Sequence, residues 1–329
     1  MLTSKSPRKV MLVAHHLASQ ILPQYSRKFS RHDFTLPQLF ACLVVKELLR
    51  CTYRQAEALL RDAESWCHAI GMNKTPDHNT LWRASRLLLT GCNVGSFLDA
   101  MARWAAGKRV LGLSLKPLGG DSTCFETRHV SRHYERRCAK ARKNLRKNRQ
   151  NRSQTVRRLP KLAVAVSCAS HLILSCWCGT GSGSDSPHFE KILFDAWRRV
   201  PHRSFSAVFD AGYDGEHNHE LARRDMGIRS IIPPWTGRPT TKPPPTHWRR
   251  RMKRLLKTRR SRRRCGYTQR WQVETVVSMI KRNLGDELRG KTARSRKRDM
   301  MLKVLTHDLM IIRRWRGLRQ SRTFLLIFT

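Results

Sequence analysis

The sequence predicts an all-helical N-terminal domain followed by a larger α/β domain. Three observations support this. Between residues 35 and 90, apolar residues recur at helical spacing behind capping residues. After about residue 110 short β-rich runs replace that pattern, and helical segments separate and follow these runs. With 329 residues, 40% of them hydrophobic, the chain can bury a sizeable core.

The helical domain is expected over residues 34–105, behind a basic N-terminal tail at residues 1–33. One helix is predicted in TLPQLFACLVVKELL, where Thr35 is a candidate N-cap. A second is predicted in TYRQAEALL, where Thr52 and Gln55 form a candidate capping box, because each can satisfy a backbone N–H of the other.

A third helix is predicted in NTLWRASRLLLTG, starting near Asn79 or Thr80 and ending at Gly91. It carries Arg83 and Arg86, so the domain could be a helix-turn-helix reader of DNA. A packing domain with exposed arginines explains the same residues. The sequence leaves both interpretations open.

The α/β domain is expected over residues 110–316, followed by a C-terminal tail at 317–329. Candidate strands are the runs LSLKPLGGD, KLAVAVSCAS, HLILSCWCG, SFSAVFD and IRSIIPP. Candidate helices are SPHFEKILFDAWRRV, the stretch after Gly266, and DMMLKVLTHDLMIIRRW, whose apolar residues recur at 302, 305, 309 and 312.

The charge of the chain indicates a polyanionic partner. Lys and Arg number 66 against 23 Asp and Glu, a formal net charge of +43. Two basic excursions from the core are predicted at residues 132–161 and 236–265. Residues 132–161 hold thirteen Lys or Arg, and residues 249–264 hold eleven and no acid. Solvated charge runs are the plain alternative, but contact with many phosphates would make DNA affinity fall steeply with salt.

Nucleic acid is favoured over a membrane, because Asn, Ser, Gln and Pro interleave the basic runs and no apolar face accompanies them. No stretch has the roughly 18 apolar residues of a spanning helix. The ten cysteines contain no C-x-x-C pair, so reduced thiols in a cytoplasmic protein are expected.

Two aspartates stand where predicted strands end. Asp121 follows LSLKPLGG and Asp210 follows SFSAVF. Neighbouring carboxylates repel each other unless cations hold them, and carboxylate oxygens suit Mg²⁺ or Mn²⁺. Two such ions roughly 3.5–4 Å apart can serve both the attacking and the leaving oxygens of a phosphodiester. Phosphoryl transfer on nucleic acid is the resulting hypothesis, although either aspartate alone could be an ordinary strand-end residue.

Glu274 is the only acid between Asp225 and Asp286. If residues 267–284 are helical, a buried stripe is expected at Val273, Val277, Ile280 and Leu284. Four polar residues would share one side of that helix next to the stripe: Tyr267, Arg270, Glu274 and Lys281. Glu274 could be a metal ligand there, or the partner of Arg270 in a plain i,i+4 ion pair.

The stretch YTQRWQVETVVSMIK fits the Y-x2-R-x3-E-x6-K signature, and the chain resembles the DDE transposases of bacterial insertion sequences. DSTCFETRHVSRHYERR is similar to the first-Asp motif of that family, and FDAGYDGEHNH to its D-x-G-Y-D motif. GIRSIIPPWTGRP, LTHDLMIIRRW and the helical TPDHNTLWR also resemble family segments. Cys124 stands where relatives often carry Gly, and Asp308 where Asn is usual.

The resemblance implies a ribonuclease-H-like mixed sheet flanked by helices. It implies that Asp121, Asp210 and Glu274 are the catalytic, metal-binding triad for two Mg²⁺ or Mn²⁺ ions. Tyr267, Arg270 and Lys281 would contact DNA near the scissile phosphate. The expected activity is metal-dependent cleavage at the element's terminal inverted repeats, followed by attack of the 3′-hydroxyl on target DNA. A homodimer in a nucleoid-associated complex is expected, because two DNA ends must be held together.

Two alternatives to an active transposase are a DNA-binding derivative without catalysis and a ribonuclease-H-like nuclease. Asp214 shares the second motif, where it could be a fourth ligand or cap the GYDGE turn. His217 and His219 could bind metal, but loop histidines facing DNA are the favoured interpretation.

Overall fold

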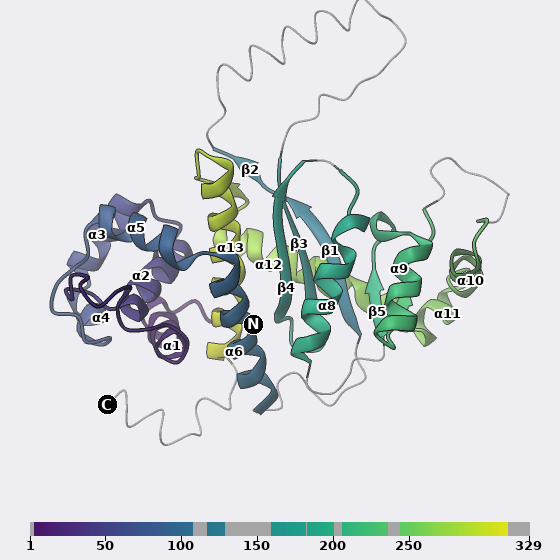
Figure 1. The fold of residues 1–329 in the computed structure, drawn as a ribbon, viewed down its shortest axis with the longest axis horizontal. Coiled ribbons are helices and arrows are strands. Elements are labelled where there is room, and N and C mark those ends of the chain that lie inside the picture. The colour runs from purple at the N-terminus through teal and green to yellow at the C-terminus, as the bar shows by residue number, and fades with distance from the viewer. Residues whose placement is uncertain are drawn as a thin grey trace, which may run out of the picture.

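The computed structural model describes residues 3–107, 117–128, 159–181, 183–200, 206–235 and 244–314, and every structural statement below concerns these residues. A helical domain lies at one end of the molecule and a mixed sheet lies beyond it (Figure 1). The long helix α13, Ala293–Arg314, runs between the two parts and packs on both.

Capping chemistry sets the starts of the N-terminal helices. Thr35 and Gln38 form a capping box at α2, and the box predicted at Thr52 and Gln55 is confirmed. The third predicted helix starts slightly earlier than expected, because Asp77 accepts a hydrogen bond from the Thr80 N–H. The six helices are α1 Pro7–Ser19, α2 Leu36–Leu48, α3 Tyr53–Asp62, α4 Glu64–His68, α5 His78–Leu88 and α6 Gly91–Gly107.

The structure differs from the expected basic tail at residues 1–33. Residues 7–19 of that segment form helix α1, which buries Val10, Ala14 and Leu17 among others. This helix packs against α2, α6 and α13. Basic residues flank a short apolar stripe here, so composition alone conceals the helix.

The sheet has five strands in the order β4-β3-β1-β5-β6. The pairs β1–β3 and β3–β4 are antiparallel, whereas β1–β5 and β5–β6 are parallel. The strands are β1 Leu118–Cys124, β3 Pro160–Ser167, β4 Ile173–Thr180, β5 Ser206–Phe209 and β6 Arg229–Ile231. A separate two-stranded sheet pairs β2 Glu126–Thr127 with β7 Glu287–Leu288.

Helices cover both faces of the five-stranded sheet, as predicted. Helix α8, Phe189–Arg199, packs on β3 and β4, while α12, Trp271–Leu284, packs on β1 from the opposite face (Figure 1). The shorter helices on the β6 side of the sheet are α9 Glu216–Glu220, η3 Leu221–Asp225, α10 His247–Leu255 and α11 Arg259–Arg264. Of the predicted basic excursions, residues 132–158 and 236–243 lie outside the described residues, and residues 160–161 already belong to β3.

Helix α13 is buried on all sides from residue 300 to residue 312. The predicted apolar residues at 302, 305, 309 and 312 are buried, and so are polar residues between them. Asp308 accepts a hydrogen bond from the Ile173 N–H at 2.9 Å, and burial raises the pKa of its carboxyl well above the ordinary value. A neutral Asp308 therefore takes the place that Asn usually has in the similar family segment.

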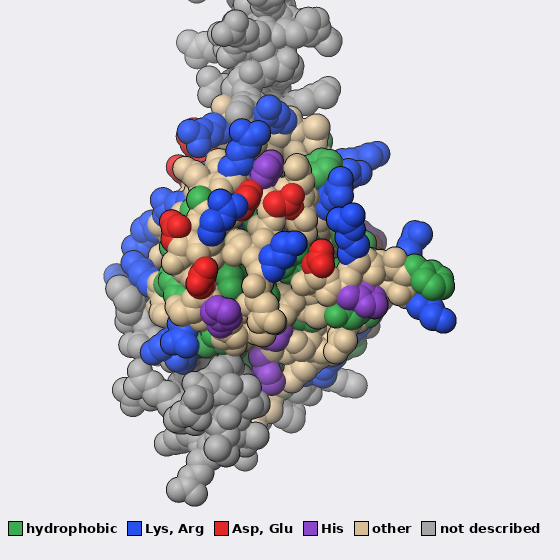
Figure 2. Space-filling view, turned by 90° about the vertical axis from the view of Figure 1, so that its left-hand side faces the viewer, with side chains coloured by type: hydrophobic (Ala, Val, Ile, Leu, Met, Phe, Trp, Pro, Cys, Tyr) green, Lys and Arg blue, Asp and Glu red, His purple; other side chains and the backbone are tan. Residues whose placement is uncertain are grey.

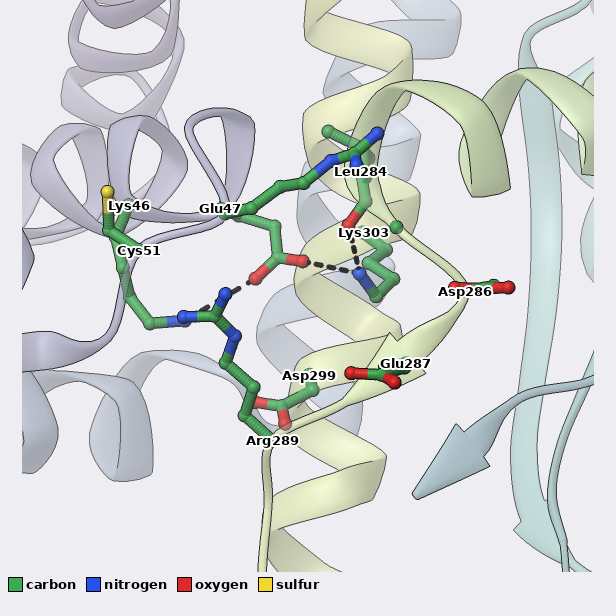
Figure 3. Close-up of a pocket in the computed structure, with 11 residues that line it drawn as sticks. Lys46, Glu47, Cys51, Leu284, Asp286, Glu287, Arg289, Asp299 and Lys303 are labelled. Atoms are coloured by element: carbon green, nitrogen blue, oxygen red, sulfur yellow. Dashed lines mark hydrogen bonds and ion pairs between the residues drawn. The ribbon is translucent and has the colours of Figure 1, made fainter. Parts of the chain in front are cut away.

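Buried ion pairs join the helical domain to the α/β domain. The Lys303 ammonium lies 2.8 Å from Glu47 of α2, and Lys46 lies 3.4 Å from the other oxygen of that carboxylate. Lys303 also donates to the Leu284 carbonyl, the last residue of α12. Figure 3 shows this junction, which lines a pocket of about 200 Å³ between α2, β7 and α13.

Arg50 holds the same end of α12. Its backbone φ of 54° is in the left-handed region, and its guanidinium donates to the Asn283 and Arg282 carbonyls. The last carbonyls of a helix lack intrahelical partners and carry partial negative charge, so cations stabilise them. The helical domain thus fixes the C-terminal end of α12.

We expect Lys303→Met to destabilise the chain by roughly 3–5 kcal/mol, because it leaves Glu47 buried without its nearer partner. Urea unfolding followed by circular dichroism measures this. Lys297→Met, at an exposed position of the same helix, is the matched control and should change stability by less than about 0.5 kcal/mol. Equal effects of the two substitutions would contradict the role of the ion pair.

Candidate active site

The register of the sheet places Asp121 beside Asp210. Strands β1 and β5 are parallel neighbours, with Gly120 opposite Phe209, so the next residues on each strand are the two aspartates. Asp210 follows directly after β5, as predicted. Asp121 lies inside β1 and not at its end, because pairing with β3 extends the strand to Cys124.

Two glycines before Asp121 let neighbouring elements approach β1. A Cβ at Gly119 would lie 2.3 Å from Val273 of α12, and one at Gly120 would lie 1.9 Å from the Phe209 ring. Side chains alternate along a strand, so Asp121 is on the same face as Gly119, where α12 packs. Since Glu274 follows Val273 in sequence, this close approach carries the third carboxylate to β1.

Arg270 is the common partner of the three carboxylates. Its guanidinium lies 3.6 Å from Asp121 and 3.8 Å from Asp210, and it donates to Glu274. The plain i,i+4 ion pair considered from sequence is therefore present, but it forms one side of a larger cluster. Side chains from β1, the end of β5 and α12 converge on one cation.

The three carboxylates differ in environment. Asp121 has 20% of its side chain exposed, whereas Asp210 and Glu274 have 48% and 53%. Burial raises the pKa of Asp121 to about 6, with Asp210 and Glu274 adding repulsion, while the Ser122 N–H and Arg270 oppose the rise. Of the three carboxylates, Asp121 is therefore the one whose ionised form its surroundings destabilise most.

The 267–284 stretch is not one continuous α-helix. Tyr267 and Arg270 belong to the 3₁₀ turn η4, Tyr267–Arg270, and α12 starts after it at Trp271. Gly266, with φ 81°, makes the left-handed turn that precedes η4. Lys281 donates to the Cys124 carbonyl at 3.0 Å, at the end of β1.

The buried stripe of α12 is mostly as expected. Val273, Ile280 and Leu284 are buried, whereas Val277 is only partly buried. Val276 and Met279 are buried as well. The stripe is therefore wider than predicted, because α12 also contacts α2 and α13.

Asp214 and the two histidines lie outside the carboxylate cluster. Arg249 and the Trp235 N–H hold the Asp214 carboxylate, whose side chain is only 3% exposed. His219 is buried and bonded to Ser230, and burial lowers its pKa to about 4, so it does not face DNA as expected. His217 is exposed. Sequence reasoning passed over Glu216, whose carboxylate binds the start of α10.

The donor set suits a hard cation, since carboxylate oxygens are the ligands that Mg²⁺ and Mn²⁺ prefer. Within the described ranges, no group of three or more His, Cys, Asp or Glu is spaced to hold a metal ion. Here Arg270 supplies the positive charge among the three carboxylates. The same carboxylate oxygens fit a divalent cation in chemistry.

Comparisons with known families decide the class of the protein. The family described as Transposase DDE domain matches residues 121–309, more than half of the chain. The family described as Transposase domain (DUF772) matches residues 8–87. Searches among curated proteins and among solved structures gave no match.

The chain belongs to the DDE transposase family. It is a protein of DNA transposition, and its class uses divalent metal for polynucleotide transfer. The transposase has no helix, among the residues described, that is long and apolar enough to cross a membrane.

The helical domain of the transposase presents Arg83 and Arg86 at its surface. Both are on the exposed face of α5, where the Arg86 guanidinium lies 4.8 Å from the centroid of the exposed Trp82 ring. Figure 2 shows the molecule from the side of this domain, with acidic side chains set among the basic ones. Positive charge on this face is therefore interrupted.

Asp121→Asn should stabilise the transposase in metal-free buffer at pH 7.5. The folded-state pKa of about 6 exceeds the ordinary 3.8, so ionised Asp121 weakens the fold as pH rises through that interval. The shift of about two units sets an upper limit of about 3 kcal/mol on the gain. Urea unfolding in EDTA should show it at pH 7.5 and none at pH 3.5. Exposed Asp225→Asn is the control, and equal behaviour of both variants would refute the assignment.

Proposed function

We propose that the transposase cuts DNA at the terminal inverted repeats of its element and joins the freed 3′-hydroxyl to target DNA. Asp121, Asp210 and Glu274 form the catalytic site of a ribonuclease-H-like domain in this proposal. The observation that carries it is the convergence of three carboxylates, from three separate elements, on Arg270. A net charge of +43 makes such a gathering of acids unlike its surroundings.

The mixed sheet supports the ribonuclease-H-like assignment. Antiparallel β1, β3 and β4 are followed by β5 and β6, which run parallel to β1. This topology puts the first acid on the central strand and the second at the end of its parallel neighbour. The third comes from the helix packed on the same face, as the glycine contacts of β1 require.

In the proposed mechanism the three carboxylates hold two Mg²⁺ or Mn²⁺ ions. Bound ions of this kind lower the pKa of water and neutralise charge on the phosphodiester. The protein's own side chains bind the ions and orient the phosphodiester. Asp121, the most buried of the three, gains most from a cation because its charge is least hydrated.

Arg270, Tyr267 and Lys281 take supporting roles. With metal ions held by the three carboxylates, the Arg270 guanidinium could bind a DNA phosphate with two parallel hydrogen bonds. Tyr267 packs partly against the cluster of Cys168 and Met252, beside Arg270. Lys281 binds the Cys124 carbonyl and so ties α12 to β1, and a phosphate close to that strand end would compete for its ammonium.

The domain boundaries support a division of labour in this proposal. Residues 34–105, joined by α1, bind DNA through Arg83 and Arg86 on α5, and residues 110–316 perform the chemistry. The basic excursions at 132–161 and 236–265 add phosphate contacts. Residues 317–329 remain a proposed C-terminal tail. The working complex is a homodimer on two element ends, located in the cytoplasm at the nucleoid.

The test incubates the purified chain with Mg²⁺ or Mn²⁺ and labelled duplex carrying the element's inverted repeats. We expect nicked ends and strand-transfer products. Asp121→Asn, Asp210→Asn and Glu274→Gln should each lower the rate by about 10³-fold or more, equivalent to about 4 kcal/mol of transition-state stabilisation. Asp225→Asn should retain the wild-type rate.

The outcomes separate the proposal from its alternatives. Binding of the repeats without cleavage would indicate a DNA-binding derivative. Cleavage without joined products, or cleavage of RNA, would indicate a nuclease. Cleavage that survives Glu274→Gln would refute the assignment of the third carboxylate.

A further inference from the structure

Helices α10 and α11 form a basic surface that packs on the far edge of the sheet. Met252, Leu256 and Cys265 are buried against Val208 of β5 and Ile231 of β6. Between residues 249 and 264, ten of the eleven Lys and Arg side chains are exposed and no acid is present. In Figure 1 the two helices lie at the opposite end of the molecule from the helical domain. We call this part, residues 247–264, the arginine surface.

Asp214 fixes the arginine surface to the D-x-G-Y-D motif. Its carboxylate accepts from the Arg249 guanidinium at 2.8 Å and from the Trp235 N–H at 2.7 Å. Arg249 also donates to the Trp235 carbonyl at 3.1 Å. Because the Asp214 side chain is almost fully buried, removing its charge leaves Arg249 without its partner in a poorly hydrated place.

Glu216 forms a second attachment at the N-terminus of α10. Its carboxylate accepts from the Trp248 N–H at 2.9 Å and from the Arg249 N–H at 3.3 Å. Thr246, the residue at the N-cap position, makes no side-chain capping bond, so Glu216 supplies that function from another segment. A carboxylate is also favourable at the positive end of the helix. The Trp248 ring packs between two guanidinium groups, with Arg223 at 4.3 Å and Arg251 at 5.4 Å from its centroid.

The arginine surface is close to the carboxylate cluster along the chain. Five residues lie between Arg264, the end of α11, and Arg270, so their Cα atoms, six steps apart, are at most about 20 Å from each other. That length corresponds to about six base-pair steps of 3.4 Å. A short duplex is therefore long enough to reach from one place to the other. The three residues between Asp210 and Asp214 make a second short connection.

We propose that the arginine surface binds the phosphate backbone of the duplex next to the cut site, and that Asp214 and Glu216 are positioning residues that hold it there. This inference rests on the proposed function for the location of the cut. In it the D-x-G-Y-D-G-E segment acts twice: Asp210 belongs to the carboxylate cluster, and the two later acids orient the DNA contact. Their negative charges serve DNA binding through the arginines that they fix.

The experiment measures binding of an arbitrary labelled duplex by the full-length chain in EDTA, between about 50 and 200 mM salt. Removing an acid from a DNA-binding protein by itself should leave affinity equal or raise it. We expect Asp214→Asn to bind more weakly. The slope of log K against log [salt] should be shallower by about 2–4, because each lost phosphate contact removes about 0.9. Glu216→Gln should act in the same direction.

Asp225→Asn is the matched control, since it removes one exposed acid from η3, the segment next to α9. Its affinity should equal or exceed that of the wild type, with an unchanged slope. Hydrogen exchange supplies a second measurement on the same proteins. Amides of residues 247–264 should exchange faster in Asp214→Asn, while those of β1 and β3 keep their protection, which shows that the variant is folded.

If Asp214→Asn binds the duplex with the same affinity and the same salt slope as Asp225→Asn, the inference is overturned and the proposed function stays intact. Loss of protection throughout the sheet would overturn it too, because Asp214 would then stabilise the whole domain. Wild-type chain that binds DNA but neither cuts nor joins repeats would overturn only the proposed chemistry. Wild-type chain that fails to bind any duplex would overturn both.

Discussion

The Lys303 ammonium is the contact on which the arrangement of the domains depends. It binds Glu47 of the helical domain and the Leu284 carbonyl at the end of α12, and it projects from α13, which contacts the helical domain, the sheet and α12. A charge this deeply buried is stable only with close partners. Because those partners come from separate parts of the chain, the ion pair fixes α12 relative to both domains, and α12 carries Glu274.

A second constraint is the repulsion among the three carboxylates gathered around Arg270. Arg270 offsets part of that repulsion, but burial, with repulsion from Asp210 and Glu274 added, still raises the pKa of Asp121. Carboxylates with a perturbed pKa in close company are common at functional sites, and their charge opposes stability. The glycines of β1 contribute by allowing α12 to approach, which brings the third acid close.

Much of the fold was predictable from local patterns. The capping residues Thr35 and Thr52, the β-rich runs and the apolar repeat of α13 are signals within a few residues, and each produced the expected element. Helix α1 was missed because basic residues flank its apolar stripe. The placement of Tyr267 and Arg270 on a single helix was wrong, since Gly266 starts a 3₁₀ turn before α12. Asp121 was placed at a strand end because pairing with β3 is not visible locally.

The sequence by itself determined most of the elements, the basic character of the chain and the three acids whose surroundings resemble family motifs. Tertiary structure decided which side chains meet. Adjacent register of β1 and β5 puts Asp121 beside Asp210, and the attachment of α10 by Asp214 and Glu216 links segments more than thirty residues apart. Periodicity and capping act over one or two helical turns, whereas these contacts depend on how sheets pair and helices pack across the whole chain.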